Sequence, residues 1–439
     1  MDGFNGQIGS SEKGQQQATT NGSQAQRTSH QVAFSGLVEI EMIAGEIRQA
    51  NCPPVVPLQN GDDLLDINGT LTLNRTNSRG NSAGSTTSGS QFGKGGAIYN
   101  ERGTVTIADG TYTSNTATLD GGAIYNNNSA TVSITSATFG GSSSTLGNTA
   151  GRDGGAIYNN AQASLAINST TFASNRADSN NDADGEGGAI YLENSSTLQL
   201  DNSILQGNSA RSGGALYSDD ATLTLTNNTF SLNSAINGGG AIFNSVGGTL
   251  ALNSGLFTTN SANVSGGAIQ NYGSLTITDI EFLNNSSGTA SAPGQGGAIY
   301  NEDGTLSISD VEFNQNRSTG DAGAIYNQGN STLTVSRTTF DLNTASLRGG
   351  AIFNNDFSSL TIDQTTFSNN SATTDGGALY NNSEFTNGTD RSATVTASTF
   401  NNNTAQNGAA IFNSNIGGLT LSSSTLSSNT ASVSGGGLA

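Results

Sequence analysis

The chain has 439 residues and a formal net charge of −19, yet only 11% of its residues are charged, against roughly 25% in an ordinary globular protein. Its 14 Lys and Arg residues are too few to neutralise a run of phosphates, which excludes a general nucleic-acid binder. One histidine, His30, and one cysteine, Cys52, exclude a Ser-His-Asp triad and a zinc cluster in the main body, and any intrachain disulfide.

Residues 1–33 form a leader rich in Gln, Ser, Gly and Thr, for which we expect disorder. The leader has neither the basic nor the apolar segment of a secretory signal, and no apolar stretch of the chain reaches the ~18 residues of a membrane span. Residues 34–94 contain an apolar run followed by a leucine-rich segment. We expect them to supply an N-terminal cap and a divergent first rung, because an open end would expose unpaired strand edges. A solvated linker is the alternative for the apolar run.

From residue 95 to the end the chain repeats a unit of 26 or 27 residues, with insertions in four copies. Each unit contains a GGAIYN-like hexapeptide, an alternating LTIT-like run and a STFSNNSA-like segment, a pattern that predicts three short strands. Such a unit cannot bury its own apolar side chains, whereas stacked units pair every strand with its equivalent. We therefore predict an all-β fold, a right-handed, single-stranded parallel β-helix of about 13 rungs over residues 95–439.

Aligned rungs place equivalent residues in columns. The aliphatic residue after GGA and the ring of the STF segment should both point into the core. An asparagine stands three residues after the ring, and its amide can bond to the equivalent amide one rung away. Ser142 is the one departure from this column. The predicted ladder contains Asn175, Asn208, Asn233, Asn260, Asn285, Asn316, Asn343, Asn370 and Asn403.

The pairing of GGAI or GGAL with FxxN, as in Gly349-Gly350-Ala351-Ile352 and Phe367-Ser368-Asn369-Asn370, resembles the repeat of chlamydial-type polymorphic outer-membrane proteins. It is also similar to the repeat of related bacterial right-handed β-helix surface proteins. The resemblance covers about residues 95–439. It implies a secreted or surface-displayed, adhesin-like passenger domain.

Strand alternation predicts that the aromatic residue after each inward isoleucine points outward. Rings with a polar tip suit interfaces, so this column is a candidate exposed track for glycans or for a partner rod. In the alternative reading the rings merely cover the rod. The candidate track contains Tyr99, Tyr125, Tyr158, Tyr191, Tyr217, Tyr300, Tyr326 and Tyr380.

Acidic residues precede the glycine pair on three consecutive rungs, and the insertion at 178–186 adds more carboxylates. Flexible, oxygen-rich ligand sets suit Ca²⁺, and a solvated acidic loop is the alternative. The candidate calcium site contains Asp120, Asp153, Asp178, Asp182, Asp184 and Glu186. Elsewhere in this column Arg348 stands between Asp321 and Asp375, and Lys94 adjoins Asp120, which predicts surface ion pairs.

Polysaccharide lyases and hydrolases also use parallel β-helices, but they need paired carboxylates in a groove, or Ca²⁺ with a basic residue. The candidate pairs are Glu193 with Asp219 or Asp220, and Glu302 with Asp303. No basic or aromatic cluster surrounds either pair in the sequence. A fold alone carries no function, so we expect no enzyme and no required cofactor. A Ca²⁺-dependent glycan-binding module and a β-helix polysaccharide lyase or hydrolase are the alternative functions.

The sequence stops inside the first strand of a new rung, at residues 435–439. We expect either a fragment of a longer passenger or a bare edge that pairs head to tail with a second copy. The expected function is a non-enzymatic extracellular or cell-surface rod, acting in adhesion or as a fibre subunit. Its expected partner is a second copy, or a host or cell-surface glycan or protein.

Overall fold

The computed structural model describes the backbone of residues 32–34, 37–43, 46–49 and 65–67. With side chains it describes residues 69–84, 93–179, 184–382, 392–414 and 418–439. Contacts divide the chain into Met1–His30 and Gln31–Ala439, and only the second unit is described below. Most of the expected disordered leader therefore lies outside the described residues, as do Cys52 and Asp182.

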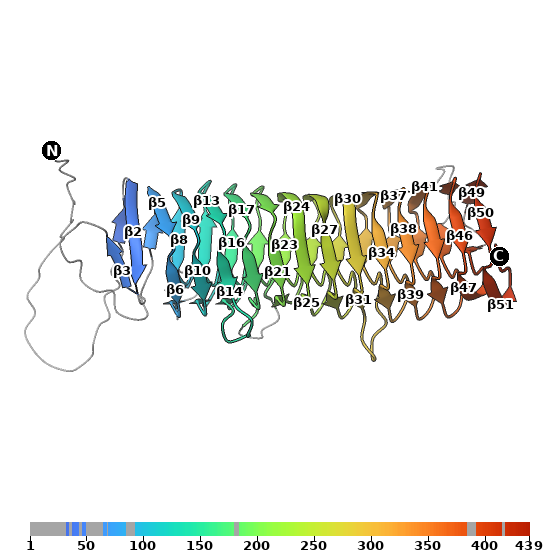
Figure 1. Ribbon diagram of the computed structural model, residues 1–439, viewed down its shortest axis with the longest axis horizontal. Helices are drawn as coiled ribbons and strands as arrows, with labels where there is room; N and C mark the ends of the chain where they lie inside the picture. The colour runs from blue at the N-terminus through green and yellow to red at the C-terminus, as the bar shows by residue number, and fades with distance from the viewer. Residues whose placement is uncertain are drawn as a thin grey trace, which may run out of the picture. The chain divides into compact units, whose positions relative to one another are not determined.

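The described chain consists of strands joined by turns, without a helix. One turn of the fold contains β32 (Ile299–Glu302), β33 (Thr305–Ser309), β34 (Glu312–Asn314) and β35 (Arg317–Ser318). β32 belongs to a 14-stranded sheet, here sheet A, and β33 and β34 belong to a 25-stranded sheet, sheet B. β35 lies in sheet C, which has segments of three and nine strands. Equivalent strands of successive turns lie side by side (Figure 1), so the predicted all-β parallel solenoid is confirmed, while its handedness stays a prediction.

The strands have the following bounds. Besides β32, sheet A contains β1 (Val32–Phe34), β4 (Leu65–Ile67), β8 (Ile98–Glu101), β12 (Ile124–Asn127), β16 (Ile157–Asn159), β19 (Ile190–Leu192), β23 (Leu216–Ser218), β26 (Ile242–Asn244), β29 (Ile269–Asn271), β36 (Ile325–Gln328), β40 (Ile352–Asp356), β44 (Leu379–Ser383) and β48 (Ile411–Asn413). Besides β33 and β34, sheet B contains β2 (Leu37–Ile43), β3 (Glu46–Gln49), β5 (Thr70–Asn74), β6 (Asn77–Arg79), β9 (Thr104–Ala108), β10 (Thr111–Thr113), β13 (Thr131–Thr135), β14 (Thr138–Gly140), β17 (Ser164–Asn168), β18 (Thr171–Ala173), β20 (Thr197–Asp201), β21 (Ile204–Gln206), β24 (Thr222–Ser231), β27 (Thr249–Thr258), β30 (Ser274–Leu283), β37 (Thr332–Ser336), β38 (Thr339–Asp341), β41 (Ser359–Asp363), β42 (Thr366–Ser368), β45 (Ser392–Thr396), β46 (Thr399–Asn401), β49 (Gly418–Ser422) and β50 (Thr425–Ser427). Besides β35, sheet C contains β7 (Ser82–Ala83), β11 (Thr116–Ala117), β15 (Thr149–Ala150), β22 (Ser209–Ala210), β25 (Ser234–Ala235), β28 (Ser261–Ala262), β31 (Ser286–Ser287), β39 (Thr344–Ala345), β43 (Ser371–Ala372), β47 (Thr404–Asn407) and β51 (Thr430–Ser434).

The solenoid begins before the first GGAIYN copy. β4, β5, β6 and β7 pair in parallel with β8, β9, β10 and β11, so the leucine-rich segment forms a complete divergent turn. β2 pairs in parallel with β5 and antiparallel with β3. The apolar run is thus part of sheet B, and β3 pairs along the edge of β2 opposite to β5.

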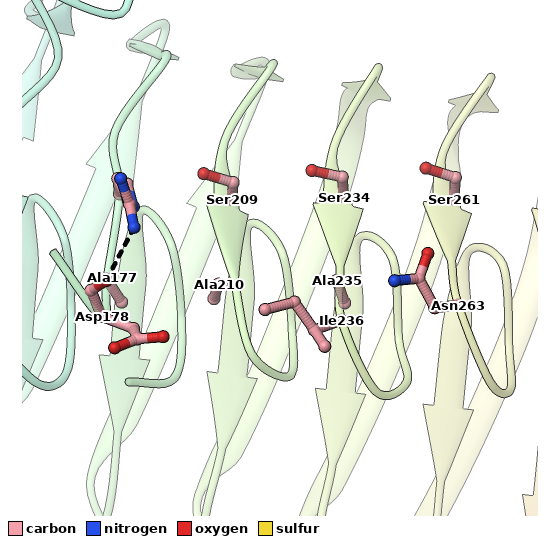
Figure 2. Close-up of a pocket in the computed structure, with 10 residues that line it drawn as sticks. Ala177, Asp178, Ser209, Ala210, Ser234, Ala235, Ile236, Ser261 and Asn263 are labelled. Atoms are coloured by element: carbon pink, nitrogen blue, oxygen red, sulfur yellow. Dashed lines mark hydrogen bonds between the residues drawn. The ribbon is translucent and has the colours of Figure 1, made fainter. Parts of the chain in front are cut away.

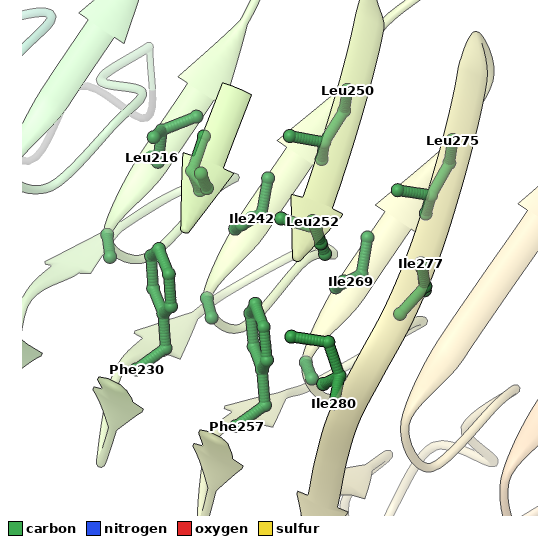
Figure 3. Packing of buried hydrophobic residues seen from close by; sticks show 14 of the residues in the cluster. Leu216, Phe230, Ile242, Leu250, Leu252, Phe257, Ile269, Leu275, Ile277 and Ile280 are labelled. Carbon is green, nitrogen blue, oxygen red and sulfur yellow. The ribbon is translucent and has the colours of Figure 1, made fainter. Parts of the chain in front are cut away.

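The core is a set of apolar columns, as expected from the repeat. Ile325, Leu333, Val335 and Phe340 of one turn are all fully buried, and each lies directly over its equivalent in the next turn. The Phe340 and Phe367 ring centroids are 4.8 Å apart with an interplanar angle of 3°. Figure 3 shows the same columns around Phe230 and Phe257. The predicted inward direction of these residues is confirmed.

The FxxN asparagines form one hydrogen-bonded column along the solenoid. Asn316 Nδ2 donates to Asn343 Oδ1 at 3.0 Å and to the Phe282 carbonyl oxygen at 2.9 Å. Ser142 does not interrupt this column, because it lies exposed in an inserted loop and Asn148 takes its place. Asn148 Nδ2 donates to Asn175 Oδ1 at 2.9 Å, and Asn115 Nδ2 donates to Asn148 Oδ1 at 3.0 Å.

In most repeats a glycine pair forms a tight bend at which successive turns approach closely. Gly296 has φ +64°, and a Cβ there would lie 2.1 Å from the Ile299 carbonyl oxygen. A Cβ on Gly297 would lie 2.1 Å from the carbonyl oxygen of Gly323 in the next turn. Only residues without a side chain fit both positions without strain.

Candidate binding surfaces

The candidate aromatic track lies on the side of sheet A that faces away from the core, but its rings are not exposed. Tyr125 and Tyr326 are only 2% and 3% exposed, and their rings stack on those of neighbouring turns, as in the 5.0 Å between the Tyr125 and Tyr158 centroids. The predicted exposure of this track is therefore wrong. Tyr99, Tyr125, Tyr158, Tyr191, Tyr300, Tyr326 and Tyr380 are buried and Tyr217 is partly buried.

Two effects bury the rings. Each ring covers the faces of its neighbours. In addition, the glycine bend folds the chain so that the residue preceding the glycine pair lies over the column of rings. Lys94 Nζ lies 4.4 Å from the centroid of the Tyr125 ring, and Arg348 Cζ lies 4.7 Å from that of Phe353. The rings therefore form a second stack outside sheet A, and a ligand has no access to their faces.

A substitution in this stack is compensated two residues along the chain. Gln270 stands where the other turns have an aromatic residue, and the Tyr272 ring lies 5.5 Å from Phe243 and 6.4 Å from Tyr300. Gln270 Nε2 donates a hydrogen bond to Tyr272 Oη at 2.6 Å. Residues 270 and 272 lie on the same side of a strand, which is the sequence signal for this replacement.

The ion pairs beside the rings are more buried than the sequence suggested. The predicted contact of Lys94 with Asp120 is present at 3.7 Å, but Asp120 is fully buried, and Arg152 pairs with both of its oxygens at 2.8 and 2.7 Å. Arg152 was missed because it stands two positions before the glycines. Arg348 donates to both oxygens of Asp321 at 3.0 and 2.9 Å, so these pairs fix neighbouring turns and are not loose surface contacts.

Asp375, expected to pair with Arg348, instead accepts a hydrogen bond from Asn407 Nδ2 at 2.8 Å. Asn407 is its equivalent in the following turn, so this polar contact also runs along the column.

The candidate calcium ligands are distributed over different environments. Asp120 is held by Arg152, Asp178 is 6% exposed and Asp184 is exposed. Burial raises the pKa of Asp153 to about 8, reinforced by the Asp120 carboxylate, and burial raises the pKa of Glu186 to about 7. Among the described residues no three carboxylate, histidine or cysteine side chains form a group that could hold a metal ion. Asp182 lies outside those residues, so calcium binding at the loop stays a prediction.

The candidate catalytic carboxylates accept hydrogen bonds from their own turn and from the next turn. Tyr300 Oη donates to Glu302 Oε2 at 2.8 Å, and Gln328 Nε2 donates to Glu302 Oε1 at 2.8 Å. Asp303 Oδ1 accepts from the Asn330 backbone nitrogen at 2.9 Å.

The other pair shows the same pattern. Asp219 Oδ1 accepts from Ser245 Oγ at 2.8 Å, and Asp220 Oδ2 accepts from Ser195 Oγ at 3.3 Å. These bonds join neighbouring turns, so Asp219 and Asp220 stabilise the stack in the same way as Glu302 and Asp303.

A groove of about 210 Å³ runs across sheet C between the turns of β22, β25 and β28. Its floor is a row of serine hydroxyls and alanine methyls, and Ile236, 54% exposed, forms part of its wall (Figure 2). At one end Arg176 donates to the Asp178 carbonyl oxygen at 3.0 Å. The groove is lined by Arg176, Ala177, Asp178, Ser209, Ala210, Ser234, Ala235, Ile236, Ser261 and Asn263. This surface offers hydroxyl groups and one aliphatic contact but no catalytic constellation.

A second hollow, of about 520 Å³, lies on the outer side of sheet B. Its charged side chains include Glu281 and Glu312, which face each other in register, and an exposed pair in which Arg337 donates to both Asp310 oxygens at 2.8 and 2.6 Å. In the part of the chain that the structure describes, no helix is long and apolar enough to cross a membrane.

Five segments of the chain match the family model described as the Chlamydia polymorphic membrane protein repeat. They are residues 169–193, 279–302, 310–328, 337–355 and 364–382. No curated protein and no solved structure matches the chain. The matched segments run from the FxxN ring to the following GGAIY strand, that is, from the stacked core rings through the asparagine ladder to the glycine bend. The chain is therefore a parallel β-solenoid in which five segments match the polymorphic membrane protein repeat.

Proposed function

We propose that this protein is a non-enzymatic rod displayed outside the cell, which acts in adhesion or as the subunit of a surface fibre. The observation that carries the proposal is the repeat match, because five separate turns share the pattern of a surface-protein family. A solenoid with a sparsely charged outer surface provides length and a repeated contact surface with little core per turn.

The engagement of the carboxylates supports a role without catalysis. Glu302, Asp303 and Asp219 each accept hydrogen bonds that join adjacent turns, whereas a glycosidase needs two carboxyl groups free to face one substrate. Asp120 and Asp321 are neutralised by arginines in the same way.

Adhesion would use the exposed outer faces. The groove on sheet C provides serine hydroxyls beside Ile236, a combination of polar and apolar groups that suits a glycan or an extended peptide. Fibre formation would use the ends, where a second copy would extend sheets A and C by the same parallel pairing that joins each turn to the next. Sheet B would be extended beyond β2 only after β3 is displaced from its edge.

Surface display is tested on intact cells that produce the full protein. Antibody labelling and external protease should reach the protein while a cytosolic marker stays protected. A protein that is labelled and cleaved only after lysis would contradict the proposal.

The two roles are separated with the purified protein. Negative-stain electron microscopy should show filaments with an axial repeat near the length of one rod if it is a fibre subunit, or single short rods if it is an adhesin. Single rods should then bind a glycan or cell surface, and Ile236→Asp should weaken binding if the groove makes contact, with the exposed Val433→Asp as control. Single rods that bind no surface and release sugars from polysaccharides would show an enzyme instead.

A further inference from the structure

The outer side of sheet B carries two columns of side chains in which hydroxyl groups predominate. Thr332 and Thr334 of one turn are exposed while Leu333 and Val335 between them are fully buried. The first column contains Thr104, Thr131, Ser164, Thr197, Thr222, Thr249, Ser274, Thr305, Thr332, Ser359 and Ser392. The second contains Thr106, Ser133, Ala166, Gln199, Thr224, Ala251, Thr276, Ser307, Thr334, Thr361, Thr394 and Thr420. We call these two columns the hydroxyl face.

The columns of the hydroxyl face are in strict register. Thr305 pairs with Thr332 and Ser307 with Thr334, and the same one-to-one pairing continues in both directions. The insertions elsewhere in the repeats leave this register unchanged, because they enter at the connections between strands. Figure 1 shows the strands that carry the face, from β13 to β41, side by side.

The face is flat along most of its length. Adjacent strands of a sheet normally rotate by about 20–25°. The core rings of the same sheet make interplanar angles between successive turns of 4° at β24–β27, 20° at β27–β30, and 2°, 3° and 6° from β34 to β46. Paired strands lie about 4.8 Å apart, which sets the spacing of the hydroxyl groups along the rod. Across the rod, alternate residues of a strand are roughly 6.6 Å apart.

The hydroxyl groups of the face are not used to hold the protein together. In the described residues, the one side-chain hydrogen bond within the two columns joins Ser359 Oγ to Thr332 Oγ1 at 3.3 Å. No member of either column is charged, although the chain carries a net charge of −19. A face built for solubility alone would be expected to carry charges.

The two columns lie beside the charged hollow on the same side of sheet B. They themselves form an uncharged, rectangular array of hydroxyl and methyl groups, which is complementary to an ordered lattice of water. Hydroxyl groups at fixed spacing bind a row of water molecules nearly as well as they bind protein groups, and threonine methyl groups restrict the orientation of the water between them. The prism faces of ice present oxygen atoms in a rectangular lattice of similar dimensions. Charged groups would disturb this match, since ions keep their own hydration shells.

We propose that the hydroxyl face binds ice. The contact is centred on β24, β27, β30, β33, β37 and β41, where the second column consists of Thr224, Ala251, Thr276, Ser307, Thr334 and Thr361. The rod as a whole would adsorb lengthwise, with the face extending about 50 Å along its axis.

The test uses the full-length protein and measures thermal hysteresis, the shape of growing ice crystals, and partition of the protein into a slowly growing ice hemisphere. The wild type should show all three activities. Thr276→Lys combined with Thr334→Lys places two charges in the centre of the face and should abolish most of the hysteresis and partition. Thr373→Lys, an exposed substitution on the side of sheet C, should leave both unchanged.

Circular dichroism and the unfolding temperature verify that all variants are folded. If the double lysine variant does not fold, Thr276→Gln combined with Thr334→Gln takes its place. Wild-type protein without hysteresis or ice partition would overturn the proposal, as would full activity in the double variant. Retention on crystalline cellulose or chitin in the absence of ice activity would also overturn it and identify an ordered polysaccharide as the partner.

Discussion

Buried asparagines are the residues on which the stack depends most directly. Asn316 donates to the Phe282 carbonyl oxygen and to Asn343 Oδ1, and its own Oδ1 accepts from the backbone and side-chain nitrogens of Asn285 at 3.0 Å. Every polar atom of the amide is thus satisfied by an adjacent turn. A buried amide that is fully bonded specifies one register, whereas a partly bonded one costs stability.

Asn316→Ala should therefore lower the free energy of unfolding by about 2–4 kcal/mol, because it removes these bonds and leaves Asn285 and Asn343 with unsatisfied groups in the core. Urea denaturation followed by circular dichroism measures the effect. Asn263→Ala, at an exposed asparagine, is the control and should cost about 0.5 kcal/mol or less. Equal effects of the two substitutions would contradict a structural role of the ladder.

Asp153 and Glu186 make the stability of the solenoid depend on pH. Burial raises the pKa of Asp153 to about 8 and that of Glu186 to about 7, whereas unfolded carboxyl groups titrate near 4. The folded state binds these protons more tightly than the unfolded state, so the associated stability is present at low pH and is lost as pH rises from about 4 through about 8.

The urea midpoint of the wild type should thus decrease as the pH is raised from about 5 to about 9. Asp153→Asn, which stays uncharged, should reduce this slope. Asp220→Asn, at an exposed carboxylate, serves as the control and should leave the pH dependence of the urea midpoint unchanged. An unchanged slope in Asp153→Asn would show that Asp153 is ionised throughout this range.

At the scale of the element, the glycine bend sets how closely the turns approach. The first position of the bend has a positive φ in each turn, and in one turn it is occupied by Ala322, with φ +60°. A residue with a Cβ in this left-handed region costs roughly 1–2 kcal/mol. The ladder and ring stacks on either side of the bend hold this conformation in place.

Ala322→Gly should therefore stabilise the protein by about 1 kcal/mol, since glycine adopts this conformation without the steric cost. The reverse change one turn later, Gly349→Ala at φ +65° with a Cβ only 2.5 Å from the Ile352 carbonyl oxygen, should destabilise it by more than that. Urea midpoints measured under the same conditions test both. A destabilising Ala322→Gly would mean that the alanine methyl makes contacts that outweigh its backbone strain.

At the largest scale, the described solenoid behaves as a one-dimensional stack, because each turn contacts only its neighbours. Thr305 of one turn pairs with Thr332 of the next, so residues 305–331 constitute one complete repeat. Stability should depend on the number of turns and on an intact register more than on which turn is present.

Deletion of residues 305–331 should yield a folded protein that is shorter by about 4.8 Å, with the strand signal in circular dichroism retained and the shortening visible in small-angle scattering. Deletion of residues 305–318 removes only part of a turn and should disrupt folding, because the columns on either side no longer align. A stable protein after the partial deletion would contradict the dependence on register.

Much of the fold follows from the sequence because the repeat itself encodes it. A period of 26 or 27 residues aligns Ile325 with Ile352 and Phe340 with Phe367, and alternation within each strand settles which residues face the core. The asparagine ladder follows from the same alignment. These features depend on spacing along the chain, and spacing is visible in a sequence.

Only the tertiary structure decided what lies outside the core strands. Alternation correctly placed Tyr326 on the outer side of its strand, but its burial depends on the rings above and below it and on the glycine bend that returns the chain over them. Asn148 occupies the ladder because an inserted loop lets the backbone rejoin the column, and Arg152 reaches Asp120 from the next turn. The physical reason is the same in each case: such contacts form between turns and around bends, where distance in space is set by the stacking of the turns.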